Sequence, residues 1–190
     1  MPKLGVIVAS VREGRAGAPV ADWFTGVAKA HGAFEVETLD LKTWDLPLLN
    51  EPNHPRLGKY TQEKTKRWSA AVAACDAYAI VTPEYNFSAP PALINALDHL
   101  YNEWGYKAAG FVSYGGVSGG LRSVQHAKTM LTTFKIVPMV EAVAIPFIGK
   151  LVENGTFNAA ENNDRHVKSA NAMLDELARW TKALNALRQP

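Results

Sequence analysis

Apolar residues fall into five short runs along the chain, and the stretches between them carry apolar residues every three or four positions. Short runs rich in valine, isoleucine and alanine are typical of strands buried on both faces of a parallel sheet. The five runs cover residues 4–9, 34–41, 77–82, 108–114 and 136–144. We therefore expect five strands, of which 34–41 alternates between apolar and polar residues as an edge strand does.

The stretches between the runs predict helices, because their spacing places one stripe of apolar side chains on a single face. The first helix carries Phe24 and Ala28 on that face and ends near Gly32, which can adopt the left-handed conformation of a helix cap. Further helices are expected at about residues 60–74, 90–100, 121–134 and 163–187. Residues 42–59 and 146–162 lack this spacing and are expected to be mostly loop.

Strands that alternate with helices favour an α/β fold with a doubly wound parallel sheet, because parallel neighbours need right-handed crossover connections. Loops rich in glycine, hydroxyl, charged or aromatic residues follow the first and third strands. Because ligands bind where the strand order reverses, we expect these two strands to be neighbours, as in the order 2-1-3-4-5. Pro138 suits an edge strand, since proline cannot donate a ladder hydrogen bond. With 190 residues, 47% of them hydrophobic and 20% charged, the chain is expected to form a single domain over residues 1–190.

Composition and charge narrow the function classes. A net charge of +2 with scattered lysines and arginines gives no reason to expect a nucleic-acid partner. No window approaches the roughly 18 apolar residues of a membrane span, and the first residues lack signal-peptide features, so we expect no membrane partner and a cytoplasmic location. The single cysteine, Cys75, is expected to be a buried, inert thiol, and the five dispersed histidines predict no metal site.

Three loops rich in special residues follow the first, third and fourth strands, at residues 10–17, 83–88 and 113–120. In the expected order they meet at the carboxyl edge of the sheet, where open α/β sheets bind ligands. The first loop offers Ser10, Arg12 and Arg15 just before a helix start, a combination that suits a terminal phosphate. It is neither a Walker A loop nor a GxGxxG fingerprint, which disfavours phosphate-transfer enzymes and the usual dinucleotide fold.

The second and third loops suit a flat ring with polar edges. Gly115 and Gly116 allow backbone amide groups to approach a ligand closely. Side chains able to stack on the ring or bond to it are Tyr85, Asn86, Phe87, Ser88 and Tyr114. For Phe87 taken alone, we expect packing into the core beneath the loop. A phosphate site and a ring site along one sheet edge together describe a mononucleotide with a large heterocycle.

The chain resembles the NADPH-dependent FMN reductase family in three segments. They read SVREGR after the first strand, PEYNFSAPPALINALDHL from Pro83 and SYGGVSGGLRSVQ from Ser113, and the second is the most specific. The resemblance covers roughly residues 3–144 and implies a flavodoxin-like three-layer sandwich. It also implies an oxidoreductase that passes hydride from NADPH or NADH through FMN to a small-molecule acceptor: free flavin, a quinone, an azo compound or a metal oxyanion.

The resemblance also implies which residues bind FMN, and it names no catalytic side chain because the flavin carries the chemistry. Ser10, Arg12 and the helix start would hold the phosphate, while the other two loops would wrap the two sides of the isoalloxazine. Where the family often has a hydroxyl residue and an asparagine, residues 16–19 of this chain read AGAP. Arg15 is therefore added as a candidate for binding the phosphate. The residues at the helix start are Gly17, Ala18, Pro19 and Val20. The residues of the two ring loops are Pro83, Glu84, Tyr85, Asn86, Phe87, Ser88, Ser113, Tyr114, Gly115 and Gly116.

The family implies a homodimer or a tetramer in which the partner subunit helps to close the flavin site. Trp104 and Tyr101 are expected at the surface, where they are available to an interaction. Arg122 and Lys107 lie near the third loop in sequence and are candidates for attracting the 2′-phosphate of NADPH. Residues 46–57 are a candidate flap over the flavin.

Two other functions remain open. Residues 116–120 read GVSGG, which matches the G-x-S-x-G motif of serine hydrolases, and Asp164 and His166 follow Ser118 in the order of a triad. The other alternative is an FMN-binding electron carrier without nicotinamide turnover. A pI near 8.6 disfavours that carrier, because such proteins usually dock through acidic surfaces.

Overall fold

The computed structural model describes residues 1–159 and 163–188. Its centre is the predicted five-stranded parallel sheet in the order β2-β1-β3-β4-β5. The strands are β1 (Lys3–Val8), β2 (Glu35–Asp40), β3 (Ala77–Pro83), β4 (Ala108–Tyr114) and β5 (Val137–Ile145). The two strands expected at the edges, β2 and β5, are the edges. The register pairs Leu4 with Ala77 and Ala77 with Ala108, so the three central strands begin at nearly the same height in the sheet.

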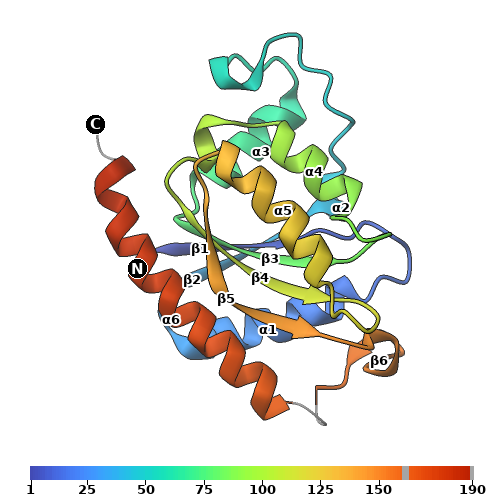
Figure 1. Cartoon of the computed structure of the whole chain (residues 1–190). Helices are drawn as coiled ribbons and strands as arrows, with labels where there is room; N and C mark the ends of the chain where they lie inside the picture. The colour runs from blue at the N-terminus through green and yellow to red at the C-terminus, as the bar shows by residue number, and fades with distance from the viewer. Residues whose placement is uncertain (160–162, 189–190) are drawn as a thin grey trace.

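Helices cover both faces of the sheet and complete the predicted three layers (Figure 1). One face carries α1 (Gly17–His31) and α6 (Asn163–Arg188). The other face carries α3 (Glu63–Ala73), α4 (Pro91–Asp98) and α5 (Leu121–Thr133). Among the described residues, none of these helices is both long enough and apolar enough to cross a membrane.

Each face of the sheet has its own hydrophobic core, because successive side chains of a strand point in opposite directions. On β1, Val6 packs into the cluster with Phe24 of α1, while the next residue, Ile7, joins the cluster with Trp68 of α3. All of these side chains are almost fully buried, and each contributes about 1.5–3 kcal/mol relative to exposure. Cys75 is buried in the second cluster, as predicted, and burial raises the pKa of its thiol to about 11.

The structure adds short elements that the apolar spacing did not predict, because each is too short to show a period. They are α2 (Leu41–Trp44), η1 (Pro55–Leu57), η2 (Asn102–Trp104), η3 (Ile148–Lys150) and the strand pair β6 (Val152–Glu153) and β7 (Thr156–Phe157). The expected loop at 146–162 therefore contains a small hairpin, and its residues 160–162 lie outside the described residues.

The expectation that Trp104 lies at the surface is wrong. Its side chain is only 1% exposed, and its indole N–H donates to the carbonyl of Leu97 at 3.1 Å. Its ring also meets that of Tyr78 edge-on, with centroids 5.0 Å apart. Trp104 thus closes the core beyond the end of α4, whereas Tyr101 is half-buried.

The expectation that Lys107 helps to attract the 2′-phosphate of NADPH is also wrong, because Lys107 precedes β4 and lies at the amino edge of the sheet, opposite the third loop. Its ammonium group is buried and donates to the carbonyls of Val72 (2.9 Å) and Ala73 (3.2 Å) and to the Tyr78 hydroxyl (3.1 Å). Burial lowers the pKa of Lys107 to about 8. The lysine therefore holds the last carbonyls of α3 and does not face a ligand.

Candidate functional site

The loops after β1, β3 and β4 meet at the carboxyl edge of the sheet, as predicted, on the right of the view in Figure 1. Hydroxyl oxygens of Ser10 and Tyr85 lie 2.7 Å apart and join the first loop to the second. The backbone N–H of Glu84 donates to the carbonyl of Tyr114 at 3.2 Å and joins the second loop to the third. The three loops therefore form one continuous surface.

The start of α1 fits an anion such as a phosphate. Ala16 precedes the helix without a capping side chain, and the first turn holds no acidic residue. Free N–H groups at a helix start attract negative charge, and the helix dipole adds to this. A Cβ atom on Gly17 would lie only 2.5 Å from the hydroxyl oxygen of Tyr114, so this glycine allows the ring to reach the helix start.

The hydroxyl of Tyr114 is buried beside that of Ser10, and no hydrogen bond of good geometry satisfies it among the described residues. An unpartnered buried hydroxyl costs about 1–3 kcal/mol, so an acceptor beside Gly17 would relieve that cost. Burial also raises the pKa of Tyr114, which keeps the hydroxyl protonated and able to donate. The Tyr114 hydroxyl is therefore placed to donate to an anion at the start of α1.

The two arginines of the first loop have different surroundings. Arg15 forms a bidentate ion pair with Asp40 at the end of β2, and its Nη1 also donates to the carbonyl of Ser10 at 2.6 Å. Arg12 is exposed, with its guanidinium carbon 5.9 Å from the ring centroid of Tyr85. Arg15 thus shapes the loop, while Arg12 is the arginine that can turn towards a phosphate.

The second loop contains a tight turn of two residues. Asn86 (φ 50°) and Phe87 (φ 68°) are both left-handed, and Tyr85 and Ser88 exchange two backbone hydrogen bonds of 3.0 and 2.9 Å. The turn leaves Phe87 69% exposed, with the guanidinium carbon of Arg122 4.0 Å from its ring centroid. The expectation that Phe87 packs into the core is therefore wrong, because the turn directs its ring outward.

Glu84 points away from the ring site and binds the third loop. Its Oε2 accepts from the Ser118 hydroxyl (2.8 Å) and from the backbone N–H of Arg122 (3.1 Å), and its Oε1 accepts from Arg122 Nη1 (2.6 Å). Burial alone would raise the pKa of Glu84, but the hydrogen bonds from Ser118 and Arg122 hold it below its usual 4.5. Glu84 therefore caps the start of α5 and ties the second loop to it.

The third loop is shaped by its glycines. Ser113 donates from its hydroxyl to the carbonyl of Gly119 at 2.8 Å, so this side chain supports the loop from below. Gly120 is left-handed (φ 85°), and a Cβ atom there would lie 2.8 Å from backbone atoms of Tyr114. A Cβ atom on Gly116 would meet nothing within 4 Å, so its backbone borders open space. Gly115 instead bonds to β5, through its N–H and the carbonyl of Ile145 at 3.2 Å.

The serine hydrolase alternative is wrong. The Ser118 hydroxyl donates to Glu84 and not to a histidine. His166 is buried beside Trp23 and Phe157, with ring centroids 6.2 and 6.5 Å away, on the face of the sheet covered by α1 and α6. The nucleophile of the proposed triad is therefore held by a carboxylate, and its base is part of a packed aromatic cluster.

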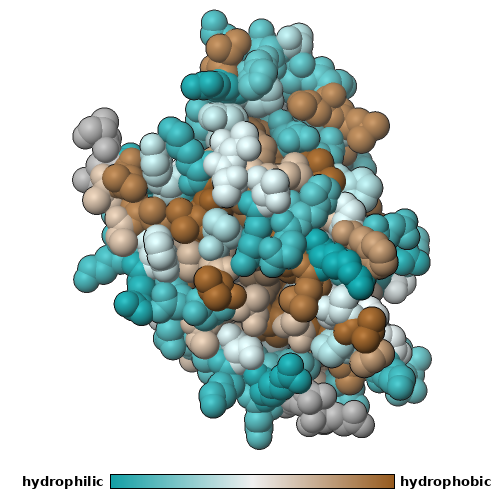
Figure 2. All heavy atoms as spheres, in the orientation of Figure 1, coloured by the Kyte–Doolittle hydropathy of each residue, from teal (hydrophilic) through white to brown (hydrophobic). Residues whose placement is uncertain are grey.

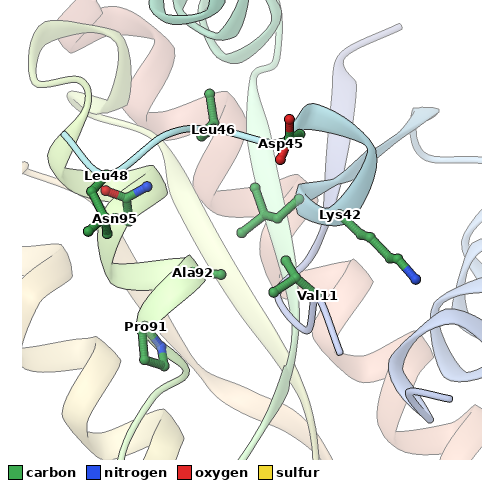
Figure 3. A pocket seen from close by; sticks show the side chains of 9 residues that line it. Val11, Lys42, Asp45, Leu46, Leu48, Pro91, Ala92 and Asn95 are labelled. Carbon is green, nitrogen blue, oxygen red and sulfur yellow. The ribbon is translucent and has the colours of Figure 1, made fainter. Parts of the chain in front are cut away.

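A cavity of about 510 Å³ adjoins the first loop and was not predicted (Figure 3). It opens between the first loop, α2 and α4. The lining residues are Val11, Leu41, Lys42, Asp45, Leu46, Leu48, Pro91, Ala92 and Asn95. Asn95 bonds to the carbonyl of Pro47 (2.8 Å) and to the N–H of Leu49 (2.9 Å), so the candidate flap at 46–57 is docked on α4 beside this cavity. The sequence signal that could have predicted this cavity is the presence of leucines within the otherwise irregular segment 42–59.

One further contact at the site was missed. The Nδ1 atom of His126, on α5, lies 2.6 Å from the Ser88 hydroxyl oxygen and 3.3 Å from the backbone nitrogen of Ala89. The sequence carries a weak signal for it, because His126 follows Arg122 by four positions and so shares its helix face.

Comparisons with known proteins identify the family of the chain. Residues 2–150 match the family described as NADPH-dependent FMN reductase. An NAD(P)H-dependent FMN reductase of Schizosaccharomyces pombe is 40% identical over 149 residues, which cover 76% of this chain and 74% of that protein. The NAD(P)H-dependent FMN reductase ntnL of a Nectria species is 34% identical, covering 77% of this chain and 76% of that one.

A solved structure supports the flavodoxin-like fold. FerB, a flavoenzyme NAD(P)H:(acceptor) oxidoreductase from Paracoccus denitrificans, superposes with a TM-score of 0.74 at 23% identity, covering 96% of this chain and 98% of that one. The sequence match and the two fungal relatives decide the family: this chain belongs to the NADPH-dependent FMN reductases.

Proposed function

We propose that this NAD(P)H-dependent flavin oxidoreductase binds FMN at the carboxyl edge of β1, β3 and β4, as one FMN-binding domain over residues 1–190. The observation that carries the proposal is the buried, unpartnered hydroxyl of Tyr114 beside the uncapped start of α1. An anion there would accept from the Tyr114 hydroxyl and from the first N–H groups of α1, so both features favour its binding.

The phosphate is assigned to the start of α1. Ser10, Arg12 and Tyr114 supply hydroxyl and guanidinium donors there, and the first helical N–H groups add to them. Pro19 has no N–H, and Val20 already donates to the carbonyl of Ala16 at 3.3 Å, so the free amide groups are those of Gly17 and Ala18. Arg15, Pro19 and Val20 then contribute by holding the loop and the helix start in shape.

The ring of the flavin is assigned to the space between the second and third loops. Pro83, Tyr85, Asn86, Phe87 and Ser88 form one side, and Tyr114, Gly115 and Gly116 form the other. Glu84 and Ser113 act from behind, because their side chains bond within the loops. When bound, FMN accepts hydride from NAD(P)H and passes electrons to a small-molecule acceptor, so the protein needs no acid or base for the first half of the reaction.

Arg122 is proposed to favour NADPH over NADH through the 2′-phosphate. Its guanidinium lies over the exposed ring of Phe87, and about half of the side chain is accessible. Replacing it by alanine should lower kcat/KM for NADPH more than for NADH, whereas Arg179→Ala on the outer face of α6 should change neither. An unchanged ratio in the Arg122 variant would remove this assignment.

A homodimer or tetramer is proposed because large apolar side chains are exposed around the site. Leu48, Phe87 and Val117 are among them, and Figure 2 shows hydrophobic side chains along the edge where the strands end. Large apolar side chains exposed at one edge of a protein are a feature of interaction surfaces. Light scattering should give at least twice the chain mass, and a monomer would contradict the proposal.

A cytoplasmic location, in keeping with the free thiol of Cys75, is tested by cell fractionation.

The function is tested by an absorption spectrum of the FMN-reconstituted protein, followed without oxygen while NADPH is added. We expect a bound flavin whose visible band bleaches, and reoxidation by added quinone or free flavin. A bound flavin that NADPH leaves coloured would instead support the electron-carrier alternative. No flavin binding at all would contradict the proposed site.

A further inference from the structure

We propose that His126 is a positioning residue that holds the second loop in its flavin-binding shape through its Nδ1 atom. The inference rests on the proposed flavin site and adds a residue that neither the motifs nor the family match assigns. His126 itself is on α5, and among the described residues it bonds to the loop at Ser88 and Ala89.

The two contacts determine which ring nitrogen carries the proton. The backbone N–H of Ala89 can only donate, so the His126 Nδ1 atom at 3.3 Å must accept. The Ser88 hydroxyl, 2.6 Å from the same atom, must then donate as well. In this arrangement the Nδ1 atom of His126 accepts from both donors, and the ring carries its hydrogen on Nε2.

Ala89 needs this acceptor. The residue is buried, and a buried backbone N–H without a partner costs about 1–3 kcal/mol. Pro90 and Pro91 follow it directly and have no N–H, so Ala89 is the last backbone donor before α4 begins. Its bond to His126 thus determines where the second loop ends and the helix starts.

The loop also needs to be held, because its turn is strained. Asn86 and Phe87 are consecutive left-handed residues, and such a conformation costs about 1–2 kcal/mol at a residue such as phenylalanine. One face of α5 holds both ends of the loop. Arg122 binds Glu84 before the turn, and His126, one helical turn later, binds Ser88 after it. Without the His126 contact, Ser88 after the turn loses its support, while Glu84 before the turn stays bonded to Arg122.

The test compares three substitutions of one residue. Asparagine places its amide oxygen near the position of Nδ1, glutamine places it near Nε2, and alanine removes the acceptor. We expect His126→Ala and His126→Gln to weaken FMN binding about tenfold and to alter the visible circular dichroism of the bound flavin. His126→Asn should bind within about twofold of wild type. His126 is exposed, so all three proteins should fold, and Gln125→Ala, at the exposed neighbouring position on α5, serves as the control.

A second measurement needs no flavin. Amide hydrogen exchange of the peptide spanning residues 84–92 should be faster in the alanine and glutamine variants and close to wild type in the asparagine variant. If asparagine behaves like alanine, or if alanine changes neither exchange nor affinity, the proposal is overturned. If wild type fails to bind FMN while the exchange pattern holds, the proposed function fails and the positioning role of His126 stands.

Discussion

The hydroxyl oxygens of Ser10 and Tyr85 lie 2.7 Å apart, although 75 residues separate them in the chain. The contact exists because β1 and β3 are neighbours in the sheet and end at the same edge. It joins the proposed phosphate part of the site to the proposed ring part, so each part can stabilise the other.

Replacing Ser10 by alanine should weaken FMN binding about tenfold, since it removes one hydrogen bond from the phosphate side and frees Tyr85. Fluorescence titration of FMN with the apoprotein measures the effect. Ser69→Ala is the matched control, because that hydroxyl bonds to Glu103 on the α3 side of the molecule. Equal affinities for the Ser10 variant and wild type would show that this hydroxyl is outside the site.

Two glycines of α1 should respond oppositely to alanine. At Gly17 the new Cβ atom would lie 2.5 Å from the Tyr114 hydroxyl oxygen, so the ring or the helix start must move and FMN binding should fall at least tenfold. At Gly26 a Cβ atom meets nothing within 4 Å, and alanine in a helix interior should stabilise the protein by about 0.5–1 kcal/mol.

Thermal unfolding of the apoproteins measures their stability, and fluorescence titration with FMN measures their affinity for the flavin. Gly26→Ala should raise Tm by roughly 1–4 °C without changing FMN affinity. If Gly17→Ala bound FMN as tightly as Gly26→Ala, the tight fit between α1 and Tyr114 would have no role in binding.

Glu84 should make stability depend on pH in the acid range. Its pKa is lowered in the folded protein, so its contribution is fully present above the unfolded pKa near 4.5 and is lost as pH falls through the lower native pKa. Glu84→Gln should cost about 1–2 kcal/mol at pH 7, the size of a helix-cap effect. Urea unfolding at several pH values should show this difference shrinking in acid, whereas exposed Glu63→Gln should show little difference at any pH.

Lys107→Met should destabilise the fold and leave the site unaffected. Removing the ammonium group deprives two carbonyls and the Tyr78 hydroxyl of their donor, which should cost about 1–3 kcal/mol at pH 7. Between pH 8 and 10.5 the folded protein binds fewer protons at this group than the unfolded chain does. The free energy of unfolding of wild type should therefore increase with pH relative to that of Lys107→Met. Urea unfolding measures both effects, and a changed preference for NADPH over NADH would contradict the placement of Lys107.

The roles of large aromatic side chains show where sequence reasoning reaches its limit. Trp104 and Phe87 each follow a short polar stretch, and neither belongs to an apolar period. The structure buries Trp104 and exposes Phe87, the reverse of the prediction. Trp104 packs against Tyr78 and donates a hydrogen bond to Leu97 of α4. The left-handed conformations of Asn86 and Phe87 direct the ring of Phe87 outward. Neither cause can be read from neighbouring residues in the chain.

Sequence by itself determined the five strands and the five long helices, because periodicity is a local property. It also predicted the strand order and the three loops at one sheet edge, because the composition of the loops indicated which strands end at a ligand-binding edge. Only the tertiary structure decided which side chains face a ligand. Arg15 turns to Asp40, 25 residues away, and Glu84 turns to Ser118, 34 residues away. His126 meets Ser88 across 38 residues. Such pairs depend on how the loops converge once the sheet has formed, and the packing of the whole domain sets that geometry.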